Sequence, residues 1–183
     1  MRKALLSFIL LAFACISYSQ DQETNTKKVF KINGINPGVS LEIPIFKKST
    51  LSANAGIGYG GSFKNTTKYA SGFLYMIGPF FDLEYRKFYN LDKRLKKNRT
   101  IKYNSGNYWG ARLLFRGKAI ASNFTRTDDV DFSIGPVWGI QRSYGKFHLL
   151  FDIGPIYYFD TLGNSGFFPF MVQINLGYNI KIH

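Results

Sequence analysis

Apolar and polar residues alternate over most of the chain, and the pattern is clearest near its end. In the range 172–182 every even position is apolar, and the odd positions between them are Gln, Asn, Gly, Asn and Lys. A period of two is typical of a β-strand whose two faces meet different surroundings. The same alternation recurs in six earlier ranges, 39–45, 51–60, 73–86, 108–116, 130–141 and 147–158. The pattern predicts an all-β fold containing these seven strands.

The two faces of the strands differ in composition, and this difference predicts which face points inward. The apolar face carries no charge and no glycine, whereas the opposite face carries nine charges and nine glycines. An eight-stranded barrel has an interior only just wide enough for side chains or one small ligand. The many large apolar residues do not fit there, which disfavours a soluble barrel with an apolar interior. We expect them to face lipid, as in transmembrane barrels.

Charged residues on the inward face predict a closed lumen. Acids and bases are nearly balanced there, and buried charges need partners because an unpaired one costs several kcal/mol. We expect Arg112 and Arg116 to pair with acids of the neighbouring strand, namely Asp82 and Glu84. A narrow gated path is the alternative. The predicted lumen network consists of Glu42, Asp82, Glu84, Arg86, Arg112, Arg116, Asp131, Asp152 and Lys181.

The lengths of the connections predict an eighth strand. The turns at 46–49 and 143–146 are short and polar, whereas 61–71, 117–129 and 160–168 are longer. In transmembrane barrels short turns face the periplasm and longer loops face outside. This parity requires one more strand at the start, which 27–35 supplies before a turn at 36–38. We therefore expect eight antiparallel strands with both termini on the periplasmic side.

The first residues predict export. A basic start, Met1-Arg2-Lys3, precedes an apolar stretch at 4–16 and the small residues of Ser17-Tyr18-Ser19. This order is typical of a cleaved signal peptide, here 1–19. A lipoprotein cleaved before Cys15 is the rival, although the residues before it match a lipobox poorly. We expect a short periplasmic segment at 20–26 and an outer-membrane barrel over 27–183.

Cysteine content and charge narrow the function further. Cleavage after residue 19 leaves no cysteine, which excludes disulfides and a cysteine nucleophile. The chain has a net charge of +13, and an exported protein meets little nucleic acid, so anionic lipid headgroups are the expected partner. After the signal peptide no run of eighteen apolar residues offers a membrane helix, which leaves a closed barrel as the way to span a membrane.

The longest connection, 87–106, is strongly basic. Parity places it in the periplasm, and 90–97 is expected to form a short helix capped by Asn90. The charge run is either a solvated surface or a contact with anionic headgroups or cell-wall polymer. Its basic residues include Lys93, Arg94, Lys96, Lys97 and Arg99.

Two stretches carry a resemblance to a known family. Phe-Tyr-Asn-Leu-Asp-Lys-Arg at 88–94 and Asn-Ser-Gly-Asn-Tyr at 104–108 resemble the small outer-membrane barrel proteins of bacteroidete-type bacteria, which have an OmpA-like transmembrane domain. The last strand also resembles the signal read by the barrel-assembly machinery, through Asn175, Gly177, Ile180 and Ile182. The resemblance implies the fold and the outer membrane, with that machinery as a partner, and no established activity.

Few residues offer catalytic chemistry. His148 and His183 are the only histidines, so a histidine-rich metal site is excluded and no cofactor is expected. A lipid-modifying enzyme would need a general base, for which His148 with inward-facing Asp152 and Tyr158 is the candidate. We expect instead a monomeric, non-enzymatic barrel with a structural or surface-interaction role. A narrow small-solute channel is the first rival, and the enzyme is the second.

Overall fold

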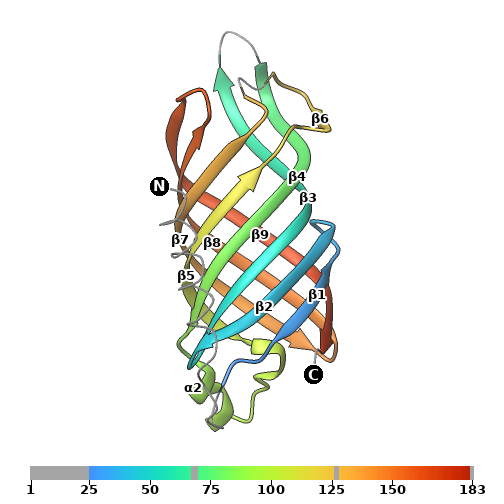
Figure 1. Ribbon diagram of the computed structural model, residues 1–183, viewed down its shortest axis with the longest axis vertical. Coiled ribbons are helices and arrows are strands. Elements are labelled where there is room, and N and C mark those ends of the chain that lie inside the picture. The colour runs from blue at the N-terminus through green and yellow to red at the C-terminus, as the bar shows by residue number, and fades with distance from the viewer. Residues whose placement is uncertain (1–24, 67–69, 126–127, 182–183) are drawn as a thin grey trace, which may run out of the picture.

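The computed structural model describes residues 25–66, 70–125 and 128–181. Eight strands form one closed antiparallel ring, in which β1 pairs with β9 to complete the circle (Figure 1). The ring consists of β1 (Val29–Asn33), β2 (Gly38–Phe46), β3 (Ser49–Thr66), β4 (Ala70–Phe88), β5 (Gly106–Arg116), β7 (Asp131–Tyr144), β8 (Phe147–Asp160) and β9 (Ser165–Lys181). A two-residue strand, β6 (Ala121–Ser122), pairs with β4 outside the ring. The all-β fold and the ring of eight strands are confirmed.

Some predictions fall outside the described residues. The expected signal peptide, 1–19, lies there with Cys15, and so do residues 20–24 and Ile182. The described residue Thr26 is buried, and its hydroxyl donates a hydrogen bond to the carbonyl of Ser49 at 3.2 Å. The chain is therefore attached to the rim of the ring just before β1 begins.

Connections alternate between the two ends of the ring, as the parity argument predicts. The α2 end carries the short helix α2 (Leu91–Lys96), the β2–β3 and β7–β8 turns and the last residues of β9 (Figure 1). The opposite end carries the last residues of β3, the first residues of β4, the described residues of 117–125 and 128–130, and the β8–β9 connection, whereas the β1–β2 turn points the same way but lies lower on the wall. The predicted first strand is confirmed, although it is shorter than 27–35.

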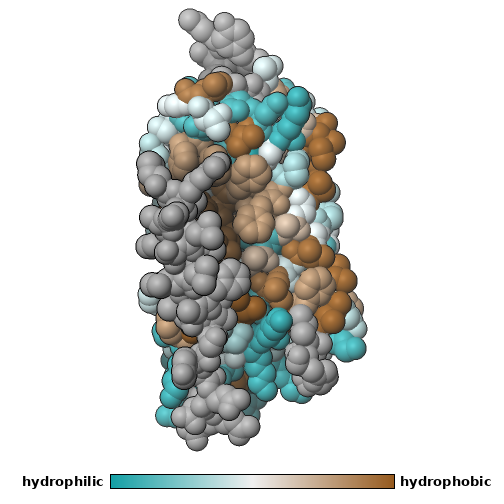
Figure 2. All heavy atoms as spheres, in the orientation of Figure 1, coloured by the Kyte–Doolittle hydropathy of each residue, from teal (hydrophilic) through white to brown (hydrophobic). Residues whose placement is uncertain are grey.

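The direction of the side chains follows the predicted alternation. On β4, Asp82, Glu84 and Arg86 are buried inside the ring, whereas Tyr75 and Phe81 are exposed. Apolar side chains cover much of the outer wall on the face drawn in Figure 2. Exposed apolar residues of the wall include Val39, Trp109, Leu113, Ile134, Trp138, Val172, Ile174, Leu176, Tyr178 and Ile180. The apolar face is the outer face.

Two predicted loops are shorter than expected, and the residue bounds predicted for them were wrong. β3 and β4 stay paired as far as Thr66 and Ala70, well inside the range 61–71. β9 begins at Ser165, so the last connection is 161–164 rather than 160–168. Backbone pairing needs no apolar side chain, and for this reason the ladder continues beyond the last alternating residue.

The β1–β2 hairpin ends part-way along the wall. Beyond its turn, β3 pairs with β4 and β9 pairs with β8. Asn36 lies in the turn and contacts both flanking strands: its amide donates to the carbonyl of Ile174 at 3.3 Å and its oxygen accepts from the backbone N–H of Tyr59 at 3.3 Å. This one side chain thus joins the hairpin tip to β9 and β3.

The predicted basic helix at 90–97 is confirmed as α2, but the predicted capping by the Asn90 side chain is wrong. Asn90 has φ −118° and ψ 13° rather than an extended backbone, and its side chain makes no capping bond. Its oxygen instead accepts from the backbone N–H of Asn107 at 2.7 Å. Asn90 therefore fixes the helix to the start of β5. No helix in the described part of the chain is long and apolar enough to cross a membrane.

Candidate functional site

Buried ion pairs fill the lumen near the middle of the ring, with Arg112 at their centre. Its guanidinium donates to both carboxylate oxygens of Asp152, at 2.8 Å each, and to Glu84 at 2.9 Å. Its Nε donates to Asp82 at 3.2 Å. Arg112 is 2% exposed, so three carboxylates from two other strands meet one cation away from water. A bidentate guanidinium–carboxylate pair of this kind is both strong and geometrically specific.

A second group of charges continues from Glu84 toward the α2 end. Arg86 donates to Glu84 at 2.9 Å and lies 3.7 Å from Glu42. Lys31 contacts the same Glu42 oxygen, with an Nζ–Oε2 distance of 2.5 Å. Gln141 accepts from both Lys31 and Arg86 and donates to Glu42. The cations and carboxylates thus form one continuous network.

One member of the predicted lumen network takes another partner than expected, and the place of a second, Lys181, stays a prediction. Arg116 does not pair with Asp82 or Glu84, which was predicted wrongly; its Nε donates to Asp131 at 2.8 Å. The register explains this, because Arg116 is directly opposite Asp131 on β7 and opposite Phe80 on β4. The side chain of Lys181 lies outside the described residues.

Sequence reasoning missed Lys31 and Gln141. Both are buried in the lumen, and Lys31 lies on the short first strand, for which the alternation gave no register. Lys31 lies between the apolar residues Phe30 and Ile32, and this alternation could have identified Lys31 as an inward-facing residue. Gln141 was on the inward face of its range, but an uncharged amide gives no sign in the sequence that it bridges two cations and a carboxylate.

Glycine makes room for an aromatic ring beside the network. Gly139 is directly opposite Tyr108, and a Cβ at residue 139 would lie 2.4 Å from the Tyr108 ring. The ring is fully buried, with the Arg86 guanidinium 5.0 Å from its centroid and the Phe88 ring 5.5 Å away. Its hydroxyl donates to Asp152 at 3.3 Å. The ring therefore links the apolar core to the ion pairs.

Substituting Gly139 with alanine is expected to destabilise the barrel by about 1–3 kcal/mol, because the Tyr108 ring must move out of its contacts. The measurement is the urea midpoint of protein refolded in detergent. Gly60→Ala is the matched control, since a Cβ there meets no atom closer than 4.0 Å on the same inward side. Equal losses at both glycines would show that the ring contact has no particular importance.

The connection after α2 closes the lumen at the α2 end. Tyr103 and Asn104 have φ of 51° and 58°, a left-handed backbone that costs on the order of 1 kcal/mol or more for residues other than glycine. This conformation directs the Asn104 amide to Glu42 at 2.9 Å and the Tyr103 carbonyl to Gln141 at 2.9 Å. Leu91 of α2 belongs to a buried apolar cluster, whose other buried members are Phe88, Tyr108, Val137 and Leu150.

The residues of the predicted basic segment differ in burial: one is buried and the others are exposed. Arg94 is buried, and its guanidinium donates two hydrogen bonds to the carbonyl of Thr100, at 3.1 Å and 2.9 Å. It is therefore a structural residue of the cap. The remaining cations, Lys93, Lys96, Lys97 and Arg99, are exposed.

His148 is not placed as the enzyme hypothesis requires. Its Nε2 lies 3.1 Å from the Asn33 side-chain oxygen, and the ring is buried. The Asp152 carboxylate is bound by Arg112, and the Tyr158 ring packs against Gly166 near the opposite end. The side-chain partner of His148 is thus the Asn33 amide, whereas a general base is oriented by an acidic group in the enzyme hypothesis.

Three of the four residues that resemble an assembly signal lie on the last ring strand, β9. Asn175 is buried in the lumen, and Ile180 is exposed on the wall. Gly177 is opposite Asn33, and a Cβ there would lie 2.1 Å from the Ile32 carbonyl oxygen and 3.0 Å from the His148 ring. Gly177 thus allows β1 and β9 to close the ring. Ile182 lies outside the described residues.

In comparisons with protein-family models, curated proteins and solved structures, nothing matches this chain. Within the described residues, no group of three or more His, Cys, Asp or Glu side chains is placed to hold a metal ion.

Proposed function

We propose that this chain is an integral outer-membrane β-barrel with a structural or surface-interaction role and a lumen closed by ion pairs. One observation carries the proposal: the wall exposes apolar side chains, while charged side chains are buried inside. In water the opposite arrangement is favourable, because burying charge costs free energy and burying apolar area releases it. In lipid the observed arrangement is the stable one.

Aromatic side chains at two levels of the wall support membrane insertion. Near the α2 end, the Trp138 indole donates to the Tyr89 hydroxyl at 3.0 Å, and Tyr85 packs against Trp109. Near the opposite end, Phe132 stacks on Phe159 and lies tilted against Phe115, with a centroid distance of 5.4 Å in each pair; the three residues come from adjacent strands. Transmembrane barrels carry such aromatic girdles at both interfaces.

The expected partners follow from this placement. With the α2 end in the periplasm, its exposed lysines and arginines face phospholipid headgroups, whose anionic members attract them. The barrel-assembly machinery is proposed to read β9, and the chain is proposed to act as a monomer, with no nucleic-acid partner.

A closed lumen predicts no steady conductance of the refolded protein in a planar bilayer. Arg112, Glu84 and Asp152 are each at most 2% exposed, so water and ions have no direct path between them. Steady single-channel currents would replace the closed barrel by the narrow-channel alternative. Insertion is checked independently by protease protection in the same lipid.

Surface labelling tests the orientation. Processing after residue 19 leaves a chain without cysteine, so Leu162→Cys and Lys97→Cys each introduce one thiol. Both residues are exposed, at the opposite end and the α2 end respectively. We expect a membrane-impermeant maleimide to label Cys at 162 on intact cells and Cys at 97 only after lysis. Labelling at 97 on intact cells would reverse the orientation.

A further inference from the structure

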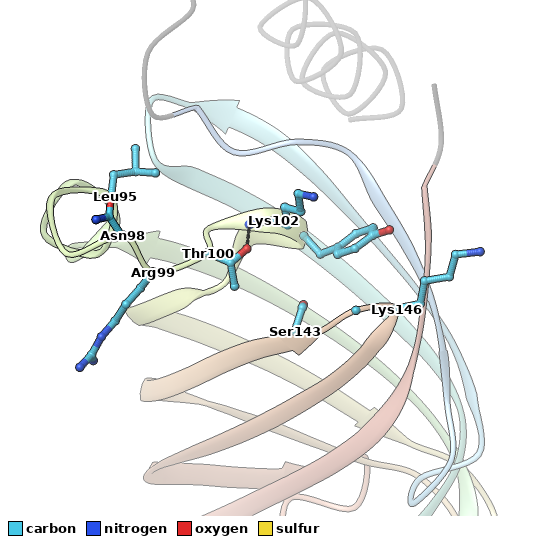
Figure 3. Close-up of a pocket in the computed structure, with 9 residues that line it drawn as sticks. Leu95, Asn98, Arg99, Thr100, Lys102, Ser143 and Lys146 are labelled. Carbon is cyan, nitrogen blue, oxygen red and sulfur yellow. Dashed lines mark hydrogen bonds between the residues drawn. The ribbon is translucent and has the colours of Figure 1, made fainter.

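A groove of about 750 Å³ lies at the α2 end, between the connection after α2 and the β7–β8 turn. Three cationic side chains line it, Arg99, Lys102 and Lys146, and among the described residues no acidic side chain does. In Figure 3, Arg99 and Lys146 lie on opposite sides of this basic groove and point away from each other, and Thr100 and Ser143 lie between them. The lining residues thus offer positive charge at the rim and hydroxyl groups at the centre.

Cationic side chains are held close together behind the groove. Burial and the nearby Arg99 together lower the pKa of Arg94, whose guanidinium is bonded to the Thr100 carbonyl. The acidic residue of α2, Asp92, forms an ion pair with Lys48. An anion bound in the basic groove would therefore relieve repulsion among cations that the fold holds close together.

The rim of the groove reaches the lipid-facing wall. Lys146 lies in the β7–β8 turn with its Nζ 5.7 Å from the centroid of the Tyr178 ring. Tyr144 and Phe147 flank that turn, and each is 69% exposed. Phe147 and Tyr178 form an edge-to-face pair with centroids 5.8 Å apart on the outer face. Exposed aromatic rings at strand ends lie at headgroup level in membrane barrels.

We propose that the basic groove binds the phosphate of an anionic phospholipid of the periplasmic leaflet. Arg99, Lys102 and Lys146, whose charged ends are at the rim, would turn inward to the phosphate, and the acyl chains would run along the wall beside Phe147 and Tyr178. Basic pockets beside a membrane-facing surface bind phospholipid headgroups in this way. The inference rests on the proposed function, because it requires the aromatic surface to face lipid.

The test is equilibrium binding of dihexanoyl phosphatidylglycerol to the refolded full-length mature protein in a neutral detergent. Dihexanoyl phosphatidylcholine and inorganic phosphate are measured in parallel. The groove variant carries Arg99→Gln, Lys102→Gln and Lys146→Gln. The matched control carries Lys93→Gln, Lys96→Gln and Lys97→Gln, which remove the same charge from exposed positions nearby that do not line the groove.

We expect the unmodified protein to prefer phosphatidylglycerol, and the groove variant to lose affinity about tenfold or more, while the control changes about twofold or less. No preference for phosphatidylglycerol, or equal losses in both variants, would overturn the site. Inorganic phosphate that binds as tightly as the lipid would assign the groove to soluble phosphate and overturn the lipid proposal.

This experiment separates the inference from the proposed function. The detergent measurement needs a folded barrel and no bilayer, and folding is confirmed for every variant by circular dichroism and a heat-dependent gel shift. A protein that inserts into bilayers but shows no lipid preference contradicts the groove alone. A protein that prefers the lipid yet fails to insert contradicts the membrane barrel and, with it, the proposed leaflet.

Discussion

Replacing Arg112 with methionine is expected to lower the free energy of unfolding by about 3–5 kcal/mol, the cost of leaving buried charges without their partner. Three carboxylates, Asp82, Glu84 and Asp152, contact this guanidinium at 2.8 to 3.2 Å. Without it, they repel one another in a lumen that is poorly solvated. If the lumen stays dry, the free energy of unfolding falls by this amount. If water enters the lumen instead, the urea midpoint falls less and the bilayer conductance rises.

Arg116→Met is the matched control for this experiment. Arg116 is also an inward arginine of β5, but its side chain is 27% exposed and it pairs with Asp131. Its loss should cost about 1 kcal/mol or less, as is usual for solvated pairs. Removing Asp152 together with Arg112 should recover part of the larger loss, which a double-mutant cycle measures. Equal effects of the two arginines would disprove the central role of Arg112.

Placing arginine on the outer wall is expected to destabilise the protein by about 2–4 kcal/mol near the bilayer midplane, and by less nearer the headgroups. Leu176→Arg and Ile134→Arg are suitable, because their parent side chains are 49% and 50% exposed. In water, substitutions at such exposed positions usually change stability by about 0.5 kcal/mol or less. The measurement is the urea midpoint in lipid vesicles.

Leu162→Arg provides the control for the wall. Leu162 is more exposed than either wall residue, at 67%, but it lies in the connection after β8. The proposed membrane ends before this connection, so its substitution should be nearly neutral. If all three arginines leave the midpoint unchanged, the wall faces water and the membrane barrel is wrong.

The alternation by itself determined the strands and their faces. Because side chains point alternately to opposite sides of a strand, Glu84 and Leu83 had to face opposite ways, and burial agrees. The parity of the connections then required a first strand, which the structure confirms as β1. The faces follow from local backbone geometry, and the first strand follows from the order and lengths of the connections, so the sequence alone sufficed for both.

The partners within the lumen were decided by the tertiary structure. Arg112 and Arg116 belong to the same face of one strand, yet one meets three carboxylates and the other meets Asp131. Pairing depends on the stagger between neighbouring strands, which sets the height of each residue in the barrel. The alternation of apolar and polar residues is the same whatever the stagger between strands, so it does not predict which residues pair.

Contacts across the barrel were also invisible in the sequence. Lys31 bonds to Gln141, and Asn104 enters the lumen from a connection whose backbone turns through two left-handed residues. Likewise, the cations around the basic groove come together only because α2 folds back toward the β7–β8 turn. The sequence determined which residues face inward, whereas closure of the ring brought distant residues to one height and so selected the pairs.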